Sequence, residues 1–275
     1  MLKYPKTILA IFILTLGTSC GSHNQQDTKQ VVSSQKTTHK MTALEQLKSI
    51  LNEHYVSEDG NEYKVELKPG LTDQQIEQLA TRLPSEQIPI DIKELLKFAS
   101  GFEFFGVEEI TFDGVGQFGF ENIFPNSVQL AGDGFGNFWI LDVDSKGNWG
   151  NIFYVCHDPA VVVKHSENLV EFIKHVHEFG KSGKESNLDV IHEKSVMDIW
   201  SDSNSGFIDI KKAETSNDTT LKNFAAELPD NFVIADLRNK PNKTGFAWGK
   251  FGPDIDNAVR YNNNLVWGFE KKAKN

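Results

Sequence analysis

The stretches of this sequence with residue types suited to chemistry are rich in glycine and aspartate. Residues 132–136 could cradle a phosphate, but they lack the G-x-G-x-x-G spacing and precede an apolar strand instead of a helix. Their glycines fit a tight hairpin, in which a positive φ is needed. The residues from Asp142 resemble the start of a calcium loop, but Lys146 replaces an oxygen ligand and Phe153 stands where the bidentate glutamate should be. Neither stretch predicts a cofactor or a metal.

The histidines and cysteines lack the spacing of a metal centre or a nucleophile with its base. His175 and His177 are two residues apart on a predicted helix, so they face different sides, and we place both on the surface. Cys156 and His157 are neighbours in a predicted strand and therefore point to opposite faces. The sequence has no G-x-S-x-G nucleophile elbow. We predict no catalytic residue, no metal ligand and no cofactor.

An excess of acidic residues restricts the class of partner. The chain has 38 Asp and Glu against 28 Lys and Arg, a formal net charge of -10, whereas nucleic-acid binding requires basic surface. We therefore predict no nucleic-acid partner and favour a basic protein, because charge complementarity speeds association and selects the target. Carboxylates flanking Phe104 and Phe105 would surround aromatic anchors with acids. The competing interpretation is that the phenylalanines are core and the acids only maintain solubility. The candidate partner-binding residues are Glu103, Glu108, Glu109, Asp113, Asp133, Asp142, Asp144 and Trp149.

The N-terminal forty residues have the pattern of an exported, tethered protein. Two lysines precede a short apolar run at 8–14, which is too short to cross a bilayer as a stable helix, so residues 1–20 are predicted to be a signal peptide. Cys20 closes a lipobox-like end and is the predicted lipidation site, although Gly17 replaces the usual aliphatic residue. Residues 21–40 are polar and predict a disordered tether. We expect a lipoprotein of the cell envelope, periplasmic or on the surface, with secretion as the alternative, and membrane contact through the lipid alone.

The folded part is predicted to run from helices into strands and back to a helix. Apolar spacing predicts a helix from Met41, a second helix capped by Thr72, and a third from about Pro89 that ends where Gly101 adopts a left-handed conformation. A strand is expected over 63–67, and antiparallel strands follow between 102 and 163. An amphipathic helix over 168–179 closes the pattern.

Three stretches carry a family resemblance. They read LTDQQIEQLATRLPSEQIPIDIKELLKFASGFEF, AGDGFGNFWILDV and NIFYVCHDPAVVVKHSENLVEFI, within residues of about 71–180. This order resembles the Smi/Knr-type domain of the SUKH superfamily. The resemblance implies an α+β fold in which helices flank an antiparallel or mixed sheet. We predict a SUKH-like domain over residues 41–182 and a small α+β C-terminal module over 185–275.

The resemblance also implies a function in binding. The family includes immunity proteins that neutralise a toxin by binding it, and cell-wall regulatory scaffolds. We therefore expect a non-enzymatic protein-binding module, an immunity protein whose partner is a basic polymorphic toxin. Nuclease toxins act in the cytoplasm, so the predicted export favours a partner at the surface or in the periplasm.

Two alternatives stay open at this stage, and so does the oligomeric state. One alternative is an envelope scaffold or cell-wall regulatory protein. The other is a glycan-binding surface protein or enzyme, suggested by four tryptophans with loop carboxylates nearby; these are Trp139, Trp149, Trp248 and Trp267. Tryptophans lining one exposed groove would favour this second alternative, and buried ones would remove its basis.

Overall fold

Three short helices precede the main sheet, and polar residues fix where two of them begin. The computed structural model describes residues 40–107, 109–116, 118–251 and 258–271. Helices α1 (Ala43–Ile50) and α2 (Asp73–Ala80) each start with a threonine capping box. The box of α2 pairs Thr72 with Gln75, as the sequence predicts. The signal peptide, Cys20 and the tether to residue 39 lie outside the described residues.

Helix α3 (Ile90–Phe98) ends differently from the prediction. Gly101 does not close it in a left-handed conformation, because the chain is already extended at Ala99 and Gly101 is the first residue of strand β4 (Gly101–Glu103). The glycine is needed for another reason. A Cβ atom there would lie 2.1 Å from the carbonyl oxygen of Ile110 on the neighbouring strand.

The short strands near the N-terminus form two small antiparallel sheets. One pairs β1 (Tyr55–Val56) with β2 (Glu62–Tyr63), and the other has the order β3 (Glu66–Leu67), β4, β5 (Ile110–Thr111). The single strand predicted over 63–67 is therefore divided between two sheets.

A five-stranded antiparallel sheet forms the centre of the fold, in the order β12-β9-β8-β7-β6. Its strands are β6 (Ser127–Gly132), β7 (Phe138–Val143), β8 (Trp149–His157), β9 (Ala160–Ser166) and β12 (Gly245–Phe246). Ile152, Tyr154 and Cys156 face a core under the helices, including α4 (Leu169–Ser182). The intervening Phe153 and Val155 face a second core. Burial of both faces explains the continuous apolar runs in these strands.

The C-terminal part adds a second layer of sheet. Its four strands are antiparallel, in the order β10 (Phe207–Asp209), β11 (Phe232–Asp236), β14 (Val266–Glu270), β13 (Val259–Arg260). Trp267 and Phe246 pack in the core between the two sheets, and the Trp267 indole donates to the Ile123 carbonyl at 2.8 Å. Strand β12 from the same C-terminal segment pairs with β9 and so extends the central sheet.

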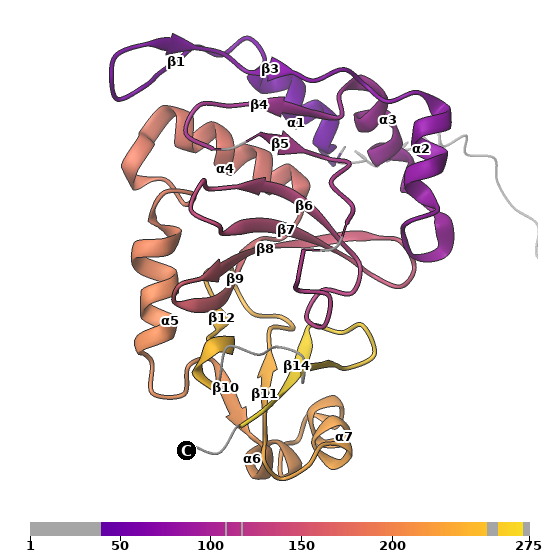
Figure 1. Cartoon of the computed structure of the whole chain (residues 1–275), viewed down its shortest axis with the longest axis vertical. Helices are drawn as coiled ribbons and strands as arrows, with labels where there is room; N and C mark the ends of the chain where they lie inside the picture. Colours follow the sequence, from indigo (N-terminus) through magenta and orange to yellow (C-terminus); the bar gives the residue numbers. More distant parts are fainter. Residues whose placement is uncertain (1–39, 108, 117, 252–257, 272–275) are drawn as a thin grey trace, which may run out of the picture. The chain divides into compact units, whose positions relative to one another are not determined.

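The remaining helices cover the outer surfaces. Helices α6 (Ile210–Glu214) and α7 (Thr219–Glu227) pack on the far face of the C-terminal sheet, and α5 (Met197–Ser201) follows a π-helical turn at Ile191–Val196. Short 3₁₀ turns lie at Pro84–Glu86, Gly183–Glu185 and Trp248–Phe251. Figure 1 shows the layers from top to bottom as helices, central sheet, C-terminal sheet and the α6/α7 pair. The predicted α+β class is confirmed. Among the described residues, none of the helices has the length and apolar character needed to cross a membrane.

Candidate functional site

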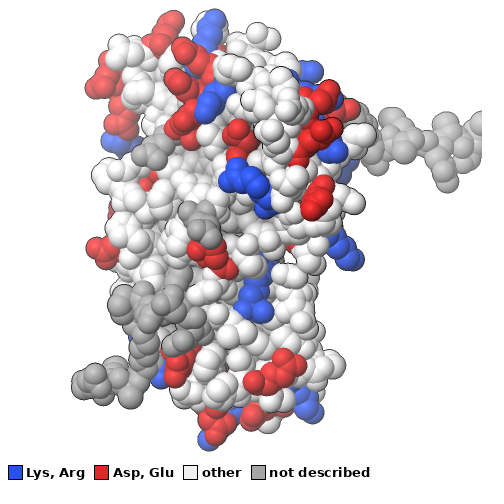
Figure 2. All heavy atoms as spheres, turned by 45° about the vertical axis from the view of Figure 1, so that its right-hand side comes forward, with Lys and Arg blue, Asp and Glu red and all other residues white. Residues whose placement is uncertain are grey.

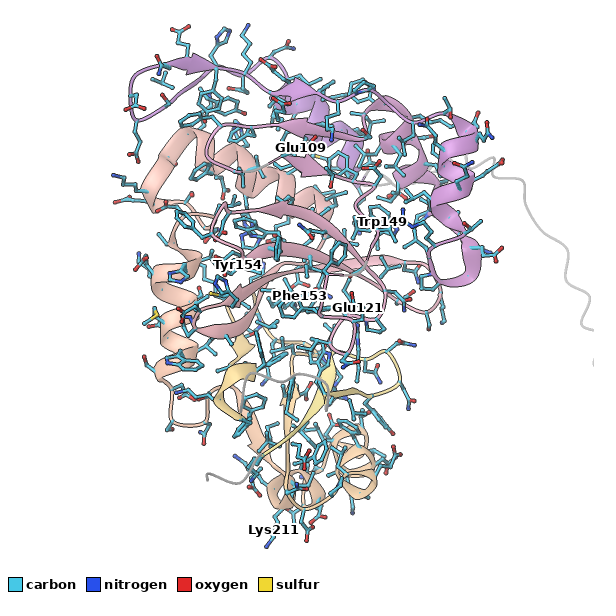
Figure 3. The ribbon with its side chains drawn as sticks, viewed as in Figure 1. Glu109, Glu121, Trp149, Phe153, Tyr154 and Lys211 are labelled. Carbon is cyan, nitrogen blue, oxygen red and sulfur yellow. The ribbon has the colours of Figure 1, made fainter. Side chains whose placement is uncertain are left out.

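The predicted partner-binding residues that the structure describes do not form one surface, because they are divided between the two ends of the central sheet. Glu103 and Glu109 lie at β4 and before β5, near the end where Asp133 begins the β6–β7 hairpin. Asp113 follows β5 and is half-buried, and Glu108 lies outside the described residues. Asp142, Asp144 and Trp149 lie around the β7–β8 turn, at the opposite end. In Figure 3 Tyr154 and Trp149 mark these two ends along β8.

The Asp133 carboxylate accepts four hydrogen bonds, three from its own hairpin and one from Tyr154 on β8. Its carboxylate accepts the backbone N–H groups of Phe135 and Asn137 at 2.9 and 3.2 Å, the Asn137 side-chain amide at 2.7 Å and the Tyr154 hydroxyl at 2.7 Å. Burial opposes ionisation of this carboxyl, but the hydrogen bonds from Asn137 and Tyr154 outweigh it and lower the pKa of Asp133. All four donors are neutral, and none of the described lysines or arginines forms an ion pair with it. Asp133 is therefore an anion without a counter-charge.

A cavity of about 510 Å³ lies beside Asp133, and we call it the hairpin pocket. The β6–β7 hairpin, the β8–β9 turn, the end of α4 and the segment 188–193 surround it. None of the described lysines or arginines lines it, whereas four carboxylates, four aromatic rings and two histidines do. These are Asp133, Asp158, Asp189, Glu193, Phe135, Trp139, Tyr154, Phe179, His157 and His192. The Asn137 side chain accepts from the His157 backbone N–H at 3.0 Å and so joins the two turns.

A shallower hollow of about 320 Å³ continues from the hairpin pocket across Val107, and we call it the aromatic groove. Phe105 is 52% exposed there, with its ring 5.3 Å from that of Tyr63. Acidic residues surround these rings, and Glu109 among them forms an ion pair with Lys68. The groove residues are Tyr63, Lys64, Glu66, Glu103, Phe104, Phe105, Val107 and Glu109. Figure 2 shows acidic side chains, with Lys and Arg side chains among them, in the upper part of the view.

The two predicted aromatic anchors have different roles. Phe105 is exposed in the aromatic groove, whereas Phe104 is buried and packs edge-on against Tyr55 at 5.0 Å. The core interpretation is therefore correct for Phe104, whereas the Phe105 side chain is exposed.

At the opposite end of the sheet, the predicted carboxylates are already engaged. Asp142 forms a two-fold ion pair with Arg260 at 2.6 and 2.7 Å, and the two side chains are 7% and 5% exposed. Asp144 accepts the Lys146 and Asn148 backbone N–H groups and the Asn148 side-chain amide. Trp149 is half-buried against the core. Asp142 thus fastens the C-terminal sheet to the central one, and Asp144 shapes a turn.

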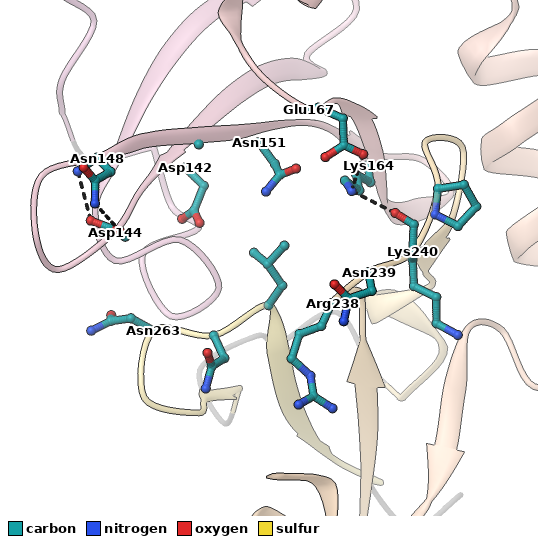
Figure 4. Close-up of a pocket in the computed structure, with 14 residues that line it drawn as sticks. Asp142, Asp144, Asn148, Asn151, Lys164, Glu167, Arg238, Asn239, Lys240 and Asn263 are labelled. Carbon is teal, nitrogen blue, oxygen red and sulfur yellow. Dashed lines mark hydrogen bonds and ion pairs between the residues drawn. The ribbon is translucent and has the colours of Figure 1, made fainter. Parts of the chain in front are cut away.

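Asp142 and Asp144 line a second cavity of about 690 Å³, between the central sheet and C-terminal loops. Figure 4 shows Asn151 directed into this cleft and Lys164 held by Glu167 and the Lys240 carbonyl, at 2.7 and 2.8 Å. Its charges balance, because three carboxylates face three cations. They are Asp142, Asp144 and Glu167 against Lys164, Arg238 and Lys240. The cleft is polar but has no excess charge to select a charged partner.

Two of the histidines lie together in the core, which corrects one prediction. His175 is buried and not on the surface, because its side of α4 faces the sheet. Its ring centroid is 4.9 Å from that of His165, and the Ser166 hydroxyl bonds the Nδ1 atoms of both rings at 2.8 and 3.1 Å. Burial lowers the pKa of His165 to about 3 and also lowers that of His175. Both rings are therefore neutral in the folded protein at neutral pH.

The strand prediction for Cys156 and His157 is confirmed. The Cys156 side chain is buried, whereas His157 is exposed on the other side of the strand. Burial raises the pKa of the Cys156 thiol to about 11, so the thiolate that a nucleophile requires is disfavoured.

The tryptophans do not form an exposed sugar-stacking groove. Trp139, Trp248 and Trp267 are buried, and Trp149 is half-buried. This removes the basis of the glycan-stacking alternative for these four side chains. Within the described ranges, no group of three or more His, Cys, Asp or Glu side chains is arranged to hold a metal ion.

The sequence contains a repeated pattern that our sequence interpretation missed. Residues 133–137 and 144–148 both read Asp-x-x-Gly-Asn. Both stretches form the loop of a hairpin, and in both the first aspartate accepts the N–H groups two and four residues later. The spacing of Asp, Gly and Asn is visible in the sequence and could have identified both turns.

Comparisons with known proteins place the hairpin pocket's strands within a family domain. No curated protein and no solved structure matches the chain. The model of the SMI1 / KNR4 family (SUKH-1) matches residues 70–175, which include α2, α3, the β6–β9 strands and the first half of α4. Over these residues, the chain therefore carries a domain of the SMI1/KNR4 (SUKH-1) family.

Proposed function

We propose that this protein is a non-enzymatic binding module that neutralises a basic protein partner, in the manner of an immunity protein. One observation carries the proposal. The aromatic groove and the hairpin pocket place exposed aromatic side chains, Phe105 and Phe135, beside carboxylates that include the unpaired Asp133. Aromatic anchors contribute most of the binding energy at many interfaces, and surrounding charge selects the partner.

The ionisation of Asp133 and Tyr154 suits binding better than it suits acid–base catalysis by these two groups. A general acid or base works best with a pKa near the operating pH. Here the pKa of Asp133 is lowered, and burial raises the pKa of Tyr154 above its ordinary range. Both shifts move the pKa values further from neutral pH. Asp133 remains an anion and Tyr154 a neutral donor, which suits recognition of a positive group.

We also propose that the partner is met outside the cytoplasm. The support is the N-terminal sequence, in which a signal-like segment, Cys20 and a polar tether precede the folded residues. A lipid on Cys20 would hold the binding surface near a membrane while the tether lets it reach a partner. Metabolic labelling with a fatty-acid analogue would test this. Loss of label in Cys20→Ser is expected, and an unlabelled wild-type protein would contradict lipidation.

Affinity capture from the cell envelope tests the binding function. The wild-type chain would be compared with Glu103→Lys/Glu109→Lys, and the captured protein would be purified for titration against both. We expect a basic protein that binds the wild type in a salt-dependent way and binds the variant at least about tenfold more weakly.

The matched control reverses two exposed acids on the far helices, Glu214→Lys/Glu227→Lys, which changes the net charge equally. This control should bind like the wild type. Capture of no protein, or equal weakening by both variants, would contradict a specific acidic binding surface. Capture of polysaccharide or envelope components by all three forms would favour a scaffold.

A further inference from the structure

The hairpin pocket has the size and walls of a ligand site. Its volume of about 510 Å³ lies within the range of small-molecule pockets, roughly 300–1,000 Å³. Phe135, Trp139, Tyr154 and Phe179 provide aromatic surface along it. A cavity walled by aromatic rings and carboxylates attracts organic cations, because the ring faces and the carboxylates both stabilise positive charge.

The polar groups in the pocket point to the same ligand class. Asp133 accepts four neutral donors and stays ionised, so its charge is not cancelled within the described protein. Trp139 is 3% exposed, lines the cavity, and has a buried indole N–H with no acceptor among the described residues. A ligand that carries a positive charge would offset the charge of Asp133. The side chain of an arginine residue carries such a charge, and Trp139 in the wall of the pocket would report its binding.

The second Asp-x-x-Gly-Asn loop separates the features that the turn requires from those that it does not. Its aspartate has the same two backbone hydrogen bonds and the same bond from asparagine. At the third position of the loop it has Lys146, where the hairpin pocket has Phe135. Phe135 is 81% exposed, and the turn therefore does not require a large apolar side chain at this position. Its exposure is accounted for if it contacts a ligand.

We propose that the hairpin pocket is a receptor for an arginine side chain of the partner. The guanidinium lies against the aromatic rings and is neutralised by Asp133, with Asp158, Asp189 and Glu193 adding negative potential. Guanidinium is preferred to ammonium because it is planar and more weakly hydrated and stacks on aromatic faces. The inference deepens the proposed function, on which it rests, by naming the group that the partner presents.

Titration of the full chain with N-acetyl-arginine amide tests the pocket directly. Indole N–H resonances would be followed by NMR, with that of Trp139 assigned from a Trp139→Phe spectrum. We expect saturable shifts of the Trp139 resonance. N-acetyl-citrulline amide, which has the same shape without the charge, should bind at least about tenfold more weakly. Equal binding of the two probes, or no saturable shift with arginine, would overturn the inference.

Two variants and their matched controls locate the site. Asp133→Asn keeps an acceptor for the turn but removes the charge, and Phe135→Ala changes an exposed side chain that the fold does not need. Each should weaken arginine binding by about tenfold or more. Asp144→Asn and Lys146→Ala make comparable changes in the other loop and should leave binding unchanged. Unchanged binding in Phe135→Ala, or equal losses in the control variants, would contradict the site.

The outcomes separate this inference from the proposed function. If a captured basic partner binds wild type, Asp133→Asn and Phe135→Ala with one affinity, the arginine pocket is wrong and the binding function stands. If no protein is captured but the arginine probe binds at Trp139, the cation site stands and the protein-binding function fails.

Discussion

The two Asp-x-x-Gly-Asn loops share their aspartate hydrogen bonds and differ in their surroundings. In both, the aspartate N–H donates to the asparagine carbonyl, at 3.2 Å in 133–137 and 3.0 Å in 144–148, and the glycine has a positive φ. The first loop adds a Tyr154 hydrogen bond and lines a pocket whose described residues include no lysine or arginine. The second loop lines a cleft with balanced charges. The aspartate of an Asp-x-x-Gly-Asn pattern therefore indicates a turn, and not by itself a binding site. Whether it also binds depends on residues that contact it from elsewhere.

The largest expected effect concerns the ion pair beside the second loop. Asp142→Ala leaves the Arg260 guanidinium buried without its partner, which should lower the free energy of unfolding by about 3 kcal/mol or more. Urea denaturation would measure it. The double variant Asp142→Leu/Arg260→Met should recover most of the loss, because it buries no unpaired charge. A loss below about 1 kcal/mol for Asp142→Ala would show that the pair does not join the two sheets energetically.

The next prediction compares the two aspartates directly. Asp144→Ala removes turn acceptors at a half-buried site and should cost about 1 kcal/mol in unfolding free energy. Asp133→Ala should cost about 1–3 kcal/mol more, because it also leaves the buried Tyr154 hydroxyl without its acceptor. The same urea titrations would resolve the difference. Equal losses would mean that Tyr154 adds nothing to the first loop.

The pH dependence of stability should separate the loops from the buried histidines. The folded pKa of His165 is about 3, below its ordinary value of 6.5, so the unfolded chain binds more protons between these values. The contribution of neutral His165 to the free energy of unfolding is complete above pH 6.5 and is lost as the pH falls toward 3. The pKa values of Asp133 and Asp144 are lowered from 3.8, so their contribution is complete above that pH and is lost below it.

Unfolding free energies measured from pH 7 to 2 would show the two windows. His165→Gln should flatten the decline between pH 6.5 and 3, whereas Asp133→Asn/Asp144→Asn should change it chiefly below pH 4. A decline between pH 6.5 and 4 that is as steep in His165→Gln as in the wild type would contradict the role of this histidine.

The smallest expected effect on stability is that of exchanging the third loop residues. Phe135→Lys and Lys146→Phe alter exposed side chains, so each should change the free energy of unfolding by less than about 0.5 kcal/mol. Phe135→Lys should nevertheless abolish the arginine response, since it adds a like charge to the pocket. Lys146→Phe should create no response in the other loop. An arginine site at 144–148 after this change would mean that an exposed aromatic ring is sufficient, and the surrounding pocket unnecessary.

Features set by neighbouring residues could be predicted from the sequence, and those set by distant ones could not. The Thr72 capping box, the hairpin at 132–136 and the opposite orientations of Cys156 and His157 depend on a few adjacent residues, and all are confirmed. The Asp142–Arg260 pair joins residues 118 positions apart, so no local pattern announces it.

The candidate site was predictable in part for the same reason. Glu103, Glu109 and Asp133 were proposed as binding residues mainly from their acidic side chains, and they line neighbouring hollows. The sequence could not indicate that Tyr154, 21 residues away, donates to Asp133, or that β12 joins the sheet of a segment far before it. The burial of His175 was missed because it depends on the position of α4 over the sheet.

The hydrogen bonding of the two loops has an evolutionary consequence. The first, fourth and fifth residues hold the turn, and the third position points outward and carries phenylalanine in one loop and lysine in the other. A single substitution at position 135 or 146 therefore changes the exposed chemistry of the loop while the hydrogen bonds of the turn are preserved. If a partner of such a protein changes, single substitutions at these exposed positions could adapt the surface to it, and each intermediate would still fold.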